Sequence, residues 1–237
     1  MTHGSAEDDE NRQLTKTVSP LSQETVNVFD RAGRLTSRVA DAGSSPHRNK
    51  TTAYEYDAAG RVVSTTDTTG VETTTAYDAA GRVTARTVDP GASPHLDLMM
   101  SYTYDANGNL TSVEDAEGHV TWYEYDDLNQ LFRITDPELR TTTYDYDVAG
   151  RQTSSEDDRG VMVTYGYDSA DRMTSLSFPA YDGATSGAIS YEYDDLDRMR
   201  QMTDPTGTTA YEYDAAGRTT DVSSPQGATS YTYDGVG

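Results

Sequence analysis

Cysteine is absent from this chain of 237 residues, which excludes disulfide bonds and thiolate chemistry. Leu, Ile, Val and Phe together contribute only 32 residues. Such a low apolar content, combined with a net charge of -22, is typical of disordered chains. No apolar run approaches the length of a membrane-spanning helix, so we expect no membrane span. Basic residues number 18 against 40 acidic ones, and this imbalance predicts that the chain does not bind nucleic acid.

The first ten residues, "MTHGSAEDDE", are polar and acidic, and we interpret residues 1–10 as an acidic N-terminal tail. This segment has neither the basic start nor the apolar centre of a secretory signal, so we expect no signal peptide in this chain. We expect one continuous repeat region, open at both ends, to occupy residues 11–237.

Tyrosine is abundant, and its placement argues against disorder. Of the 18 tyrosines, 17 occupy Tyr-x-Tyr positions that precede an aspartate, and the octapeptide "YEYDAAGR" occurs at both 54–61 and 211–218. Regular self-similarity of this kind is the signature of a repeat protein. Residues 30–57 and 78–105 align without gaps, which indicates that a pair of repeats was duplicated. The aspartates lie 20 to 27 residues apart, at Asp30, Asp57, Asp78, Asp105, Asp126, Asp147, Asp168, Asp194, Asp214 and Asp234.

The third residue after each of these aspartates is always Gly, Asn or Asp. These three residue types best tolerate a positive φ, so the pattern predicts a tight turn with a left-handed residue. The aspartate is expected to accept hydrogen bonds from backbone N–H groups of the same turn. The positions are Gly33, Gly60, Gly81, Gly108, Asn129, Gly150, Asp171, Asp197, Gly217 and Gly237.

Each repeat is predicted to form one β-hairpin. Residues at i and i+2 of a strand share a face, so the two tyrosines of a repeat lie together. Apolar residues recur five and eight places after the aspartate, as at Leu131 and Ile134. This odd offset puts them on opposite faces unless a β-bulge intervenes. The sequence therefore predicts an all-β fold: a curved antiparallel β-meander strip of about ten hairpins.

The motif Tyr-x-Tyr-Asp-x-x-Gly-Arg resembles the YD repeats of the RHS family over residues 11–237. The resemblance implies a β-strip that spirals into a hollow shell, as in bacterial polymorphic toxins, insecticidal toxin complexes and teneurins. It also implies a non-catalytic segment whose partners are the rest of a larger RHS-type polypeptide or an enclosed effector. Such a protein is expected to be secreted or to lie at the cell surface. The family's autoproteolytic segment and toxin are not matched here, so we do not extend those activities to this chain.

The residues of the two identical octapeptides are assigned a structural role, with no catalytic, cofactor-binding or metal-binding residue predicted. The arginine after each turn is expected to stack on neighbouring tyrosines or to pair with aspartates of adjacent repeats. The assigned residues are Tyr54, Tyr56, Asp57, Gly60 and Arg61 in the first copy, and Tyr211, Tyr213, Asp214, Gly217 and Arg218 in the second.

Three alternative functions compete with this structural interpretation. Paired carboxylates suit glycoside hydrolysis, but aspartates with the same turn role in every copy do not define one active site. The stretch "DANGNL" at 105–110 begins like a calcium loop, but Leu110 stands where that loop needs glycine. Rows of exposed tyrosine suit sugar rings, so a surface adhesion module that binds glycans stays open as the alternative. Burial of the tyrosines distinguishes a scaffold from a glycan-binding surface.

Overall fold

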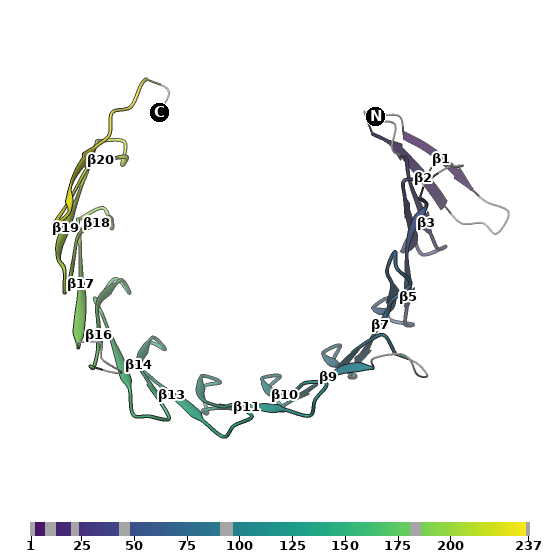
Figure 1. The fold of residues 1–237 in the computed structure, drawn as a ribbon, viewed down its shortest axis with the longest axis horizontal. Helices are drawn as coiled ribbons and strands as arrows, with labels where there is room; N and C mark the ends of the chain where they lie inside the picture. The colour runs from purple at the N-terminus through teal and green to yellow at the C-terminus, as the bar shows by residue number, and fades with distance from the viewer. Residues whose placement is uncertain are drawn as a thin grey trace. The chain divides into compact units, whose positions relative to one another are not determined.

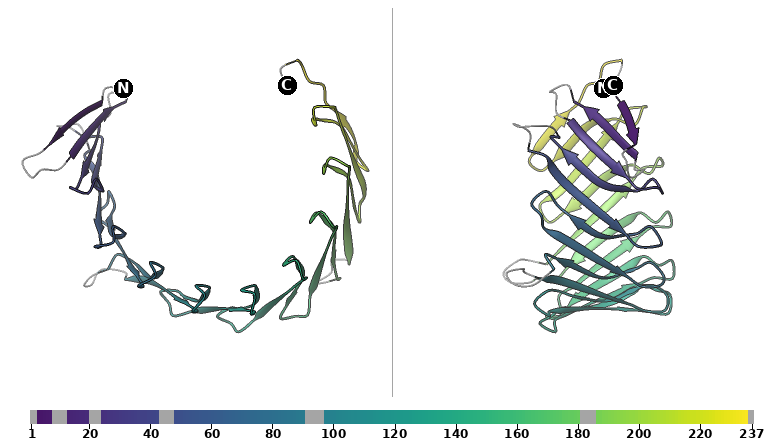
Figure 2. Two further views of the ribbon diagram at one scale, coloured as in Figure 1. Left: turned by 180° about the vertical axis from the view of Figure 1, so that it is seen from behind. Right: turned by 90° about the vertical axis from the view of Figure 1, so that its right-hand side faces the viewer.

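The computed structural model describes residues 3–7, 13–19, 24–42, 48–90, 97–180 and 186–235. Within these residues all regular structure is β-strand, in a single layer in each of two units (Figures 1 and 2). The first unit covers Met1–Thr121 and the second Trp122–Gly237. The described residues contain no helix with the length and apolar character needed to span a membrane. The strands are β1 His3–Glu7, β2 Gln13–Val18, β3 Glu24–Phe29, β4 Leu35–Ala40, β5 Lys50–Tyr56, β6 Val62–Thr66, β7 Glu72–Tyr77, β8 Val83–Val88, β9 Leu98–Tyr104, β10 Leu110–Glu114, β11 Val120–Tyr125, β12 Leu131–Thr135, β13 Thr141–Tyr146, β14 Gln152–Asp157, β15 Met162–Tyr167, β16 Met173–Phe178, β17 Gly187–Tyr193, β18 Met199–Asp204, β19 Gly207–Tyr213, β20 Thr219–Ser224 and β21 Gly227–Ser230.

Consecutive strands pair in antiparallel fashion throughout each unit. In the first unit the pairing runs from β1 to β10. In the second it runs from β11 to β21. The predicted all-β antiparallel meander is therefore confirmed in each unit. Part of the segment that we interpreted as a tail is a strand, because His3–Glu7 pairs residue by residue with β2.

A β-bulge lies in every Tyr-Asp hairpin for which the structure gives the register, and it resolves the odd apolar offset. Tyr125 faces Leu131 and Tyr123 faces Ile134, with one extra residue of β12 between the two pairs. The bulge therefore brings both apolar residues to the tyrosine face, which is the condition under which the odd offset fits a one-sided pattern. The same shift occurs between Glu55 and Tyr56.

A hydrophobic core is almost absent from the described residues. Ala42 is the one buried hydrophobic side chain among them, and no large side chain is fully buried. The surface area is 15626 Å², against about 10,500 Å² for a compact monomer of this length. The strand face opposite the tyrosines carries small polar residues, of which Ser64, Ser112 and Ser154 are buried. A single layer with this little burial depends on its hydrogen bonds and turns for stability.

The duplicated repeats at 30–57 and 78–105 each contain a longer loop, and the residues that flank the two loops have the same backbone conformation. Asp41 and Asp89 both have a φ of 56°, and Asn49 and Asp97 have φ values of 46° and 47°. In each copy the second residue of the pair donates its N–H to the carbonyl of the first, at 3.1 and 3.2 Å. This geometry agrees with the duplication indicated by the sequence. The inserted residues themselves, including both Ser-Pro-His sequences, lie outside the described residues, as does Tyr181.

Leu139 is a strained exception among the turn residues, and its replacement is the first testable prediction. Its φ is 65° and its side chain is exposed, whereas the left-handed region costs an L-residue about 1–2 kcal/mol. We expect Leu139→Gly to raise the free energy of unfolding by about 0.5–1 kcal/mol, since strain is relieved at little loss of packing. Leu139→Asn should also stabilise. Urea denaturation measures both, and a less stable Leu139→Gly would contradict the assignment of strain.

Candidate functional site

The turn at Asp57 shows how one repeat is closed. Asp57 Oδ1 accepts the N–H groups of Ala59 and Arg61, both at 2.9 Å. Its other oxygen, Oδ2, accepts Nε of Arg61 at 2.7 Å and pairs with the same guanidinium at 2.6 Å. Backbone bonds between Asp57 and Arg61 (2.9 Å) and from Gly60 to Asp57 (3.0 Å) complete the turn. One carboxylate therefore organises both the turn backbone and the arginine that follows it.

The third residue after the aspartate of each Tyr-Asp motif was predicted to have a positive φ. It does so in every repeat in which the structure describes that residue. Gly60 has a φ of 81°, and the non-glycine residue Asn129 has a φ of 61°. Residue choice at this position is therefore set by backbone conformation. The other members are Gly33, Gly81, Gly108, Gly150, Asp171, Asp197 and Gly217, and Gly237 lies outside the described residues.

Where an arginine follows the turn, it extends to the next repeat. The guanidinium of Arg61 lies 4.6 Å from the ring centre of Tyr77, and its Nη1 donates to the carbonyl of Asp78 at 3.1 Å. Stacking on a neighbouring tyrosine, one of the two predicted arrangements, is therefore observed. The stacked pairs are Arg34 and Tyr56, Arg61 and Tyr77, Arg82 and Tyr104, Arg151 and Tyr167, Arg172 and Tyr193, Arg198 and Tyr213, and Arg218 and Tyr233.

The other predicted arrangement, pairing with aspartates of adjacent repeats, is mainly replaced by pairing within the turn. Arg61 pairs with Asp57 of its own turn because the side chains four residues apart meet across the tight turn. Arg151 and Arg172 additionally reach the carboxylates of Asp171 and Asp197 in the next repeat, at 2.8 and 2.6 Å. Asp171 and Asp197 are the left-handed residues of the turns in those next repeats, where most turns have Gly, and they supply the extra carboxylates.

The second tyrosine of a repeat anchors it to the preceding one in eight of the described repeats. The hydroxyl of Tyr77 donates to the carbonyl of Val62 at 2.9 Å, while its ring lies beneath Arg61. We call this arrangement of tyrosine, arginine and aspartate the YD ladder. Equivalent hydroxyl bonds, at 2.6 to 2.9 Å, are made by Tyr56, Tyr104, Tyr146, Tyr167, Tyr193, Tyr213 and Tyr233.

The second octapeptide repeats this geometry in the second unit. Tyr213 donates its hydroxyl to Met199 at 2.6 Å and lies beneath Arg198 at 4.5 Å. Asp214 accepts the N–H and Nε of Arg218 at 2.9 and 2.7 Å. Tyr54 and Tyr211 occupy the first tyrosine position, facing Thr65 and Val222 across their hairpins, and both are half-buried. Gly217 has a φ of 82°.

The stretch that begins like a calcium loop forms an ordinary turn of the ladder. Asp105 Oδ1 accepts the N–H groups of Asn107 and Asn109 at 2.9 and 2.8 Å. Its Oδ2 accepts the Asn109 amide at 2.8 Å, in the role that arginine plays elsewhere. The carboxylate therefore makes the bonds of a YD turn, in agreement with the interpretation from the sequence.

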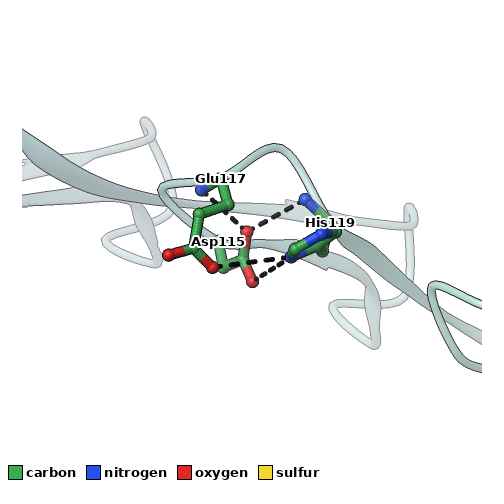
Figure 3. A group of neighbouring side chains, drawn as sticks. All are labelled: Asp115, Glu117 and His119. Carbon is green, nitrogen blue, oxygen red and sulfur yellow. Dashed lines mark hydrogen bonds and ion pairs between the residues drawn. The ribbon is translucent and has the colours of Figure 1, made fainter.

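One group of side chains has the composition of a metal site, and sequence reasoning did not single it out. Asp115, Glu117 and His119 lie in the turn after β10, and their potential ligand atoms are all within 4.8 Å of one another (Figure 3). A hollow of about 410 Å³ lies beside this turn, with apolar walls that include Leu98 and Met100. The spacing Asp-x-Glu-x-His was the available signal. Of the other histidines, His47 and His95 lie outside the described residues, and only the backbone of His3 is described.

The turn carboxylates make stability depend on pH. The N–H of Arg61 donates to Asp57 and, with the Arg61 guanidinium, holds the pKa of that carboxyl below its ordinary value, although desolvation opposes this shift. The Arg198 guanidinium likewise lowers the pKa of Asp194. A lowered pKa stabilises the fold above the unfolded-state value of about 3.9, and the contribution is lost as pH falls through the folded-state value.

We therefore expect the urea midpoint to fall steeply below about pH 4, with little change between pH 7 and pH 5. Added salt screens the overall charge repulsion and should leave this drop in place. A midpoint at pH 3 equal to that at pH 7 would show that the turn carboxylates do not stabilise the fold.

The fold and the YD ladder define a class of protein: an antiparallel β-repeat whose units are joined by recurring side-chain contacts, in place of a core. The chain belongs to the teneurin YD-shell family, whose model matches residues 45–236. This membership confirms the sequence resemblance and indicates a structural shell role. None of the curated proteins compared with the chain matches it.

Solved structures of toxin complexes have the same fold. The crystal structure of TcdB2-TccC3 superimposes with a TM-score of 0.70 at 18% identity, over 93% of this chain and 13% of that one. TcdB2-TccC3-TEV gives 0.69 at 17%, with the same coverage. The Tc holotoxin pore of Photorhabdus luminescens gives 0.58 at 17%, over 90% of this chain and 14% of that one. The chain therefore spans about one eighth of the length of these relatives, and the likeness at this identity is one of fold.

Proposed function

We propose that this chain is a non-catalytic part of the wall of a YD-repeat shell, within a larger polypeptide, and that the shell encloses an effector protein. The observation that carries this proposal is a single-layered sheet without a core, in which Ala42 is the one buried hydrophobic side chain of the described residues. A layer of this kind is stabilised repeat by repeat, and so it can be extended to any length. A layer that can be extended in this way is suited to form the wall of a large shell.

The ladder also supports a passive role for the carboxylates. Both oxygens of Asp57 accept hydrogen bonds from its own turn, and Asp214 makes the same bonds. Carboxylates held in this way are ionised and fixed, whereas general acid catalysis needs a carboxyl with a raised pKa. The acidic residues of the turns are therefore assigned to architecture.

The proposed partners are the remainder of the polypeptide and the enclosed effector, and the proposed location is outside the cell or on its surface. Both follow from the proposed shell role, and the solved structures that share the fold include a Tc holotoxin pore. To test the proposal, the complete polypeptide that contains this segment is digested with protease under native conditions. An effector that survives intact, and is degraded after the shell is unfolded in urea, is the expected result. An effector degraded equally in both states would contradict enclosure.

The glycan-binding alternative gains no support from the tyrosine rows. Tyr56 and Tyr77 are half-buried, each lies beneath an arginine, and each hydroxyl donates to a carbonyl. Ring faces that stack on arginine are not available to stack on sugars. Tyr231 and Tyr233, near the end of the second unit, are the exposed tyrosines of the described residues. A glycan array without hits at high micromolar protein is the expected outcome.

A further inference from the structure

The turn formed by Asp115, Glu117 and His119 holds three potential metal ligands on alternate residues. His119 Nδ1 lies 3.0 Å from Asp115 Oδ2 and 3.6 Å from Glu117 Oε2. The other oxygen of Asp115 accepts the N–H groups of Glu117 and His119, both at 2.9 Å. These two bonds fix the carboxylate, so that Oδ2 is directed toward the imidazole (Figure 3). The site is thus partly organised by its own backbone.

A second turn with the same spacing, at 136–140, binds a cationic side chain between its two carboxylates. We call it the sister turn. In the second unit, Asp136, Glu138 and Arg140 occupy the same three positions of a turn. Arg140 Nη2 lies 2.6 Å from Asp136 Oδ2 and 2.9 Å from Glu138 Oε2. The two carboxylates of such a turn therefore converge on one positively charged centre. At 115–119 the guanidinium is replaced by an imidazole, which is a metal ligand when neutral.

We propose that Asp115, Glu117 and His119 form a site for a divalent transition metal of the zinc type. Zinc lies about 2.0–2.2 Å from nitrogen and carboxylate oxygen, which places the donors of a tetrahedral site about 3.3–3.6 Å apart. The two separations from His119 Nδ1, 3.0 Å to Asp115 and 3.6 Å to Glu117, lie close to that range, and all three ligand atoms lie within 4.8 Å of one another. An imidazole donor disfavours Ca²⁺ and Mg²⁺, which take oxygen ligands. The net charge of -22 raises the local concentration of cations.

The surroundings leave the fourth coordination position to water or to another ligand. The side chains of Asp115 and His119 are 41% and 57% exposed, so the metal would lie at the surface. Asp115 and Glu117 also line the hollow of about 410 Å³ beside the turn. Arg86 also lines this hollow, and its positive charge favours an anionic fourth ligand over a second cation. The proposal does not depend on the shell function.

Zinc chloride is titrated into the intact chain by calorimetry, and Co²⁺ is added separately to record its visible absorption. We expect one Zn²⁺ per chain. His119→Arg, which copies the sister turn and so preserves the fold, should weaken binding by at least about tenfold, and Glu117→Gln should weaken it as well. Glu138→Gln is the matched control, since it removes the equivalent carboxylate from the turn that holds arginine. His95→Asn controls for histidine content. Far-UV circular dichroism checks the fold of each variant.

Binding of one Zn²⁺ that both controls retain and His119→Arg loses supports the site, together with a Co²⁺ spectrum that disappears in the same variant. The absence of Zn²⁺ binding by the unmodified chain overturns the proposal. Equal affinity in His119→Arg and the unmodified chain also overturns it, because binding would then reflect the acidic surface in general.

Discussion

Replacing Tyr56 with alanine is expected to lower the free energy of unfolding by about 2–3 kcal/mol. The ring lies beneath the guanidinium of Arg34 at 4.8 Å, and the hydroxyl donates to the carbonyl of Leu35 at 2.7 Å. Alanine removes both contacts and leaves that carbonyl without its donor. The loss falls below that of a fully buried aromatic residue because the ring is half-buried. Chemical denaturation followed by circular dichroism measures it.

Two further variants separate the contribution of the Tyr56 ring to stability from that of its hydroxyl. Tyr56→Phe keeps the ring and removes only the hydroxyl, so it should cost about 1 kcal/mol. Glu55→Ala changes the exposed neighbour on the opposite face and should stay within about 0.5 kcal/mol of the unmodified chain. If Tyr56→Ala were no more harmful than Glu55→Ala, the ladder would not hold the repeats together.

Gly60→Val is the second substitution with a large expected effect, a destabilisation of about 1–3 kcal/mol. Its φ of 81° is a conformation that β-branched residues strongly disfavour. The nearest atom to an added Cβ is Arg34 Nη1 at 3.8 Å, so strain in the backbone is the cause and steric overlap is not. Gly60→Asn should be milder, since Asn129 adopts a φ of 61° at the equivalent position.

Gly235→Val is the matched control for the turn argument. An added Cβ there meets no atom within 4 Å, and its φ lies outside the left-handed region. The melting temperature of Gly235→Val should therefore equal that of the unmodified chain, while that of Gly60→Val falls. Equal melting temperatures for all three proteins would mean that the left-handed turn residue is not required.

Much of the fold could be predicted because the same position can be compared across all the repeats of one chain. The restriction of one turn position to Gly, Asn and Asp predicts a positive φ there. The odd apolar offset left two possibilities, opposite faces or a β-bulge, and the structure decides for the bulge. Leu139 was missed, although it too stands three residues after an aspartate, Asp136, and its φ of 65° follows the same turn geometry. Leucine carries no residue-type signal for that conformation, so only the spacing could have revealed it.

The contacts of the ladder could be predicted only in part. Arginine was expected near tyrosines and aspartates, but the sequence does not decide between the aspartate of its own turn and that of the next repeat. That choice depends on how far adjacent hairpins are offset, which brings Arg61 over Tyr77 and within 3.1 Å of the Asp78 carbonyl. The carbonyl partner of each tyrosine hydroxyl likewise follows from strand register. The convergence of Asp115, Glu117 and His119 became visible only with the turn folded.

A double-mutant cycle between Arg61 and Tyr77 tests most directly whether the YD ladder joins successive repeats. The free energy of unfolding is measured for the unmodified chain, Arg61→Ala, Tyr77→Ala and the double variant. Because the guanidinium lies 4.6 Å from the ring centre, the ladder predicts a coupling energy of about 0.5–1 kcal/mol between the two positions. Additive losses, with a coupling energy of about zero, would contradict the account.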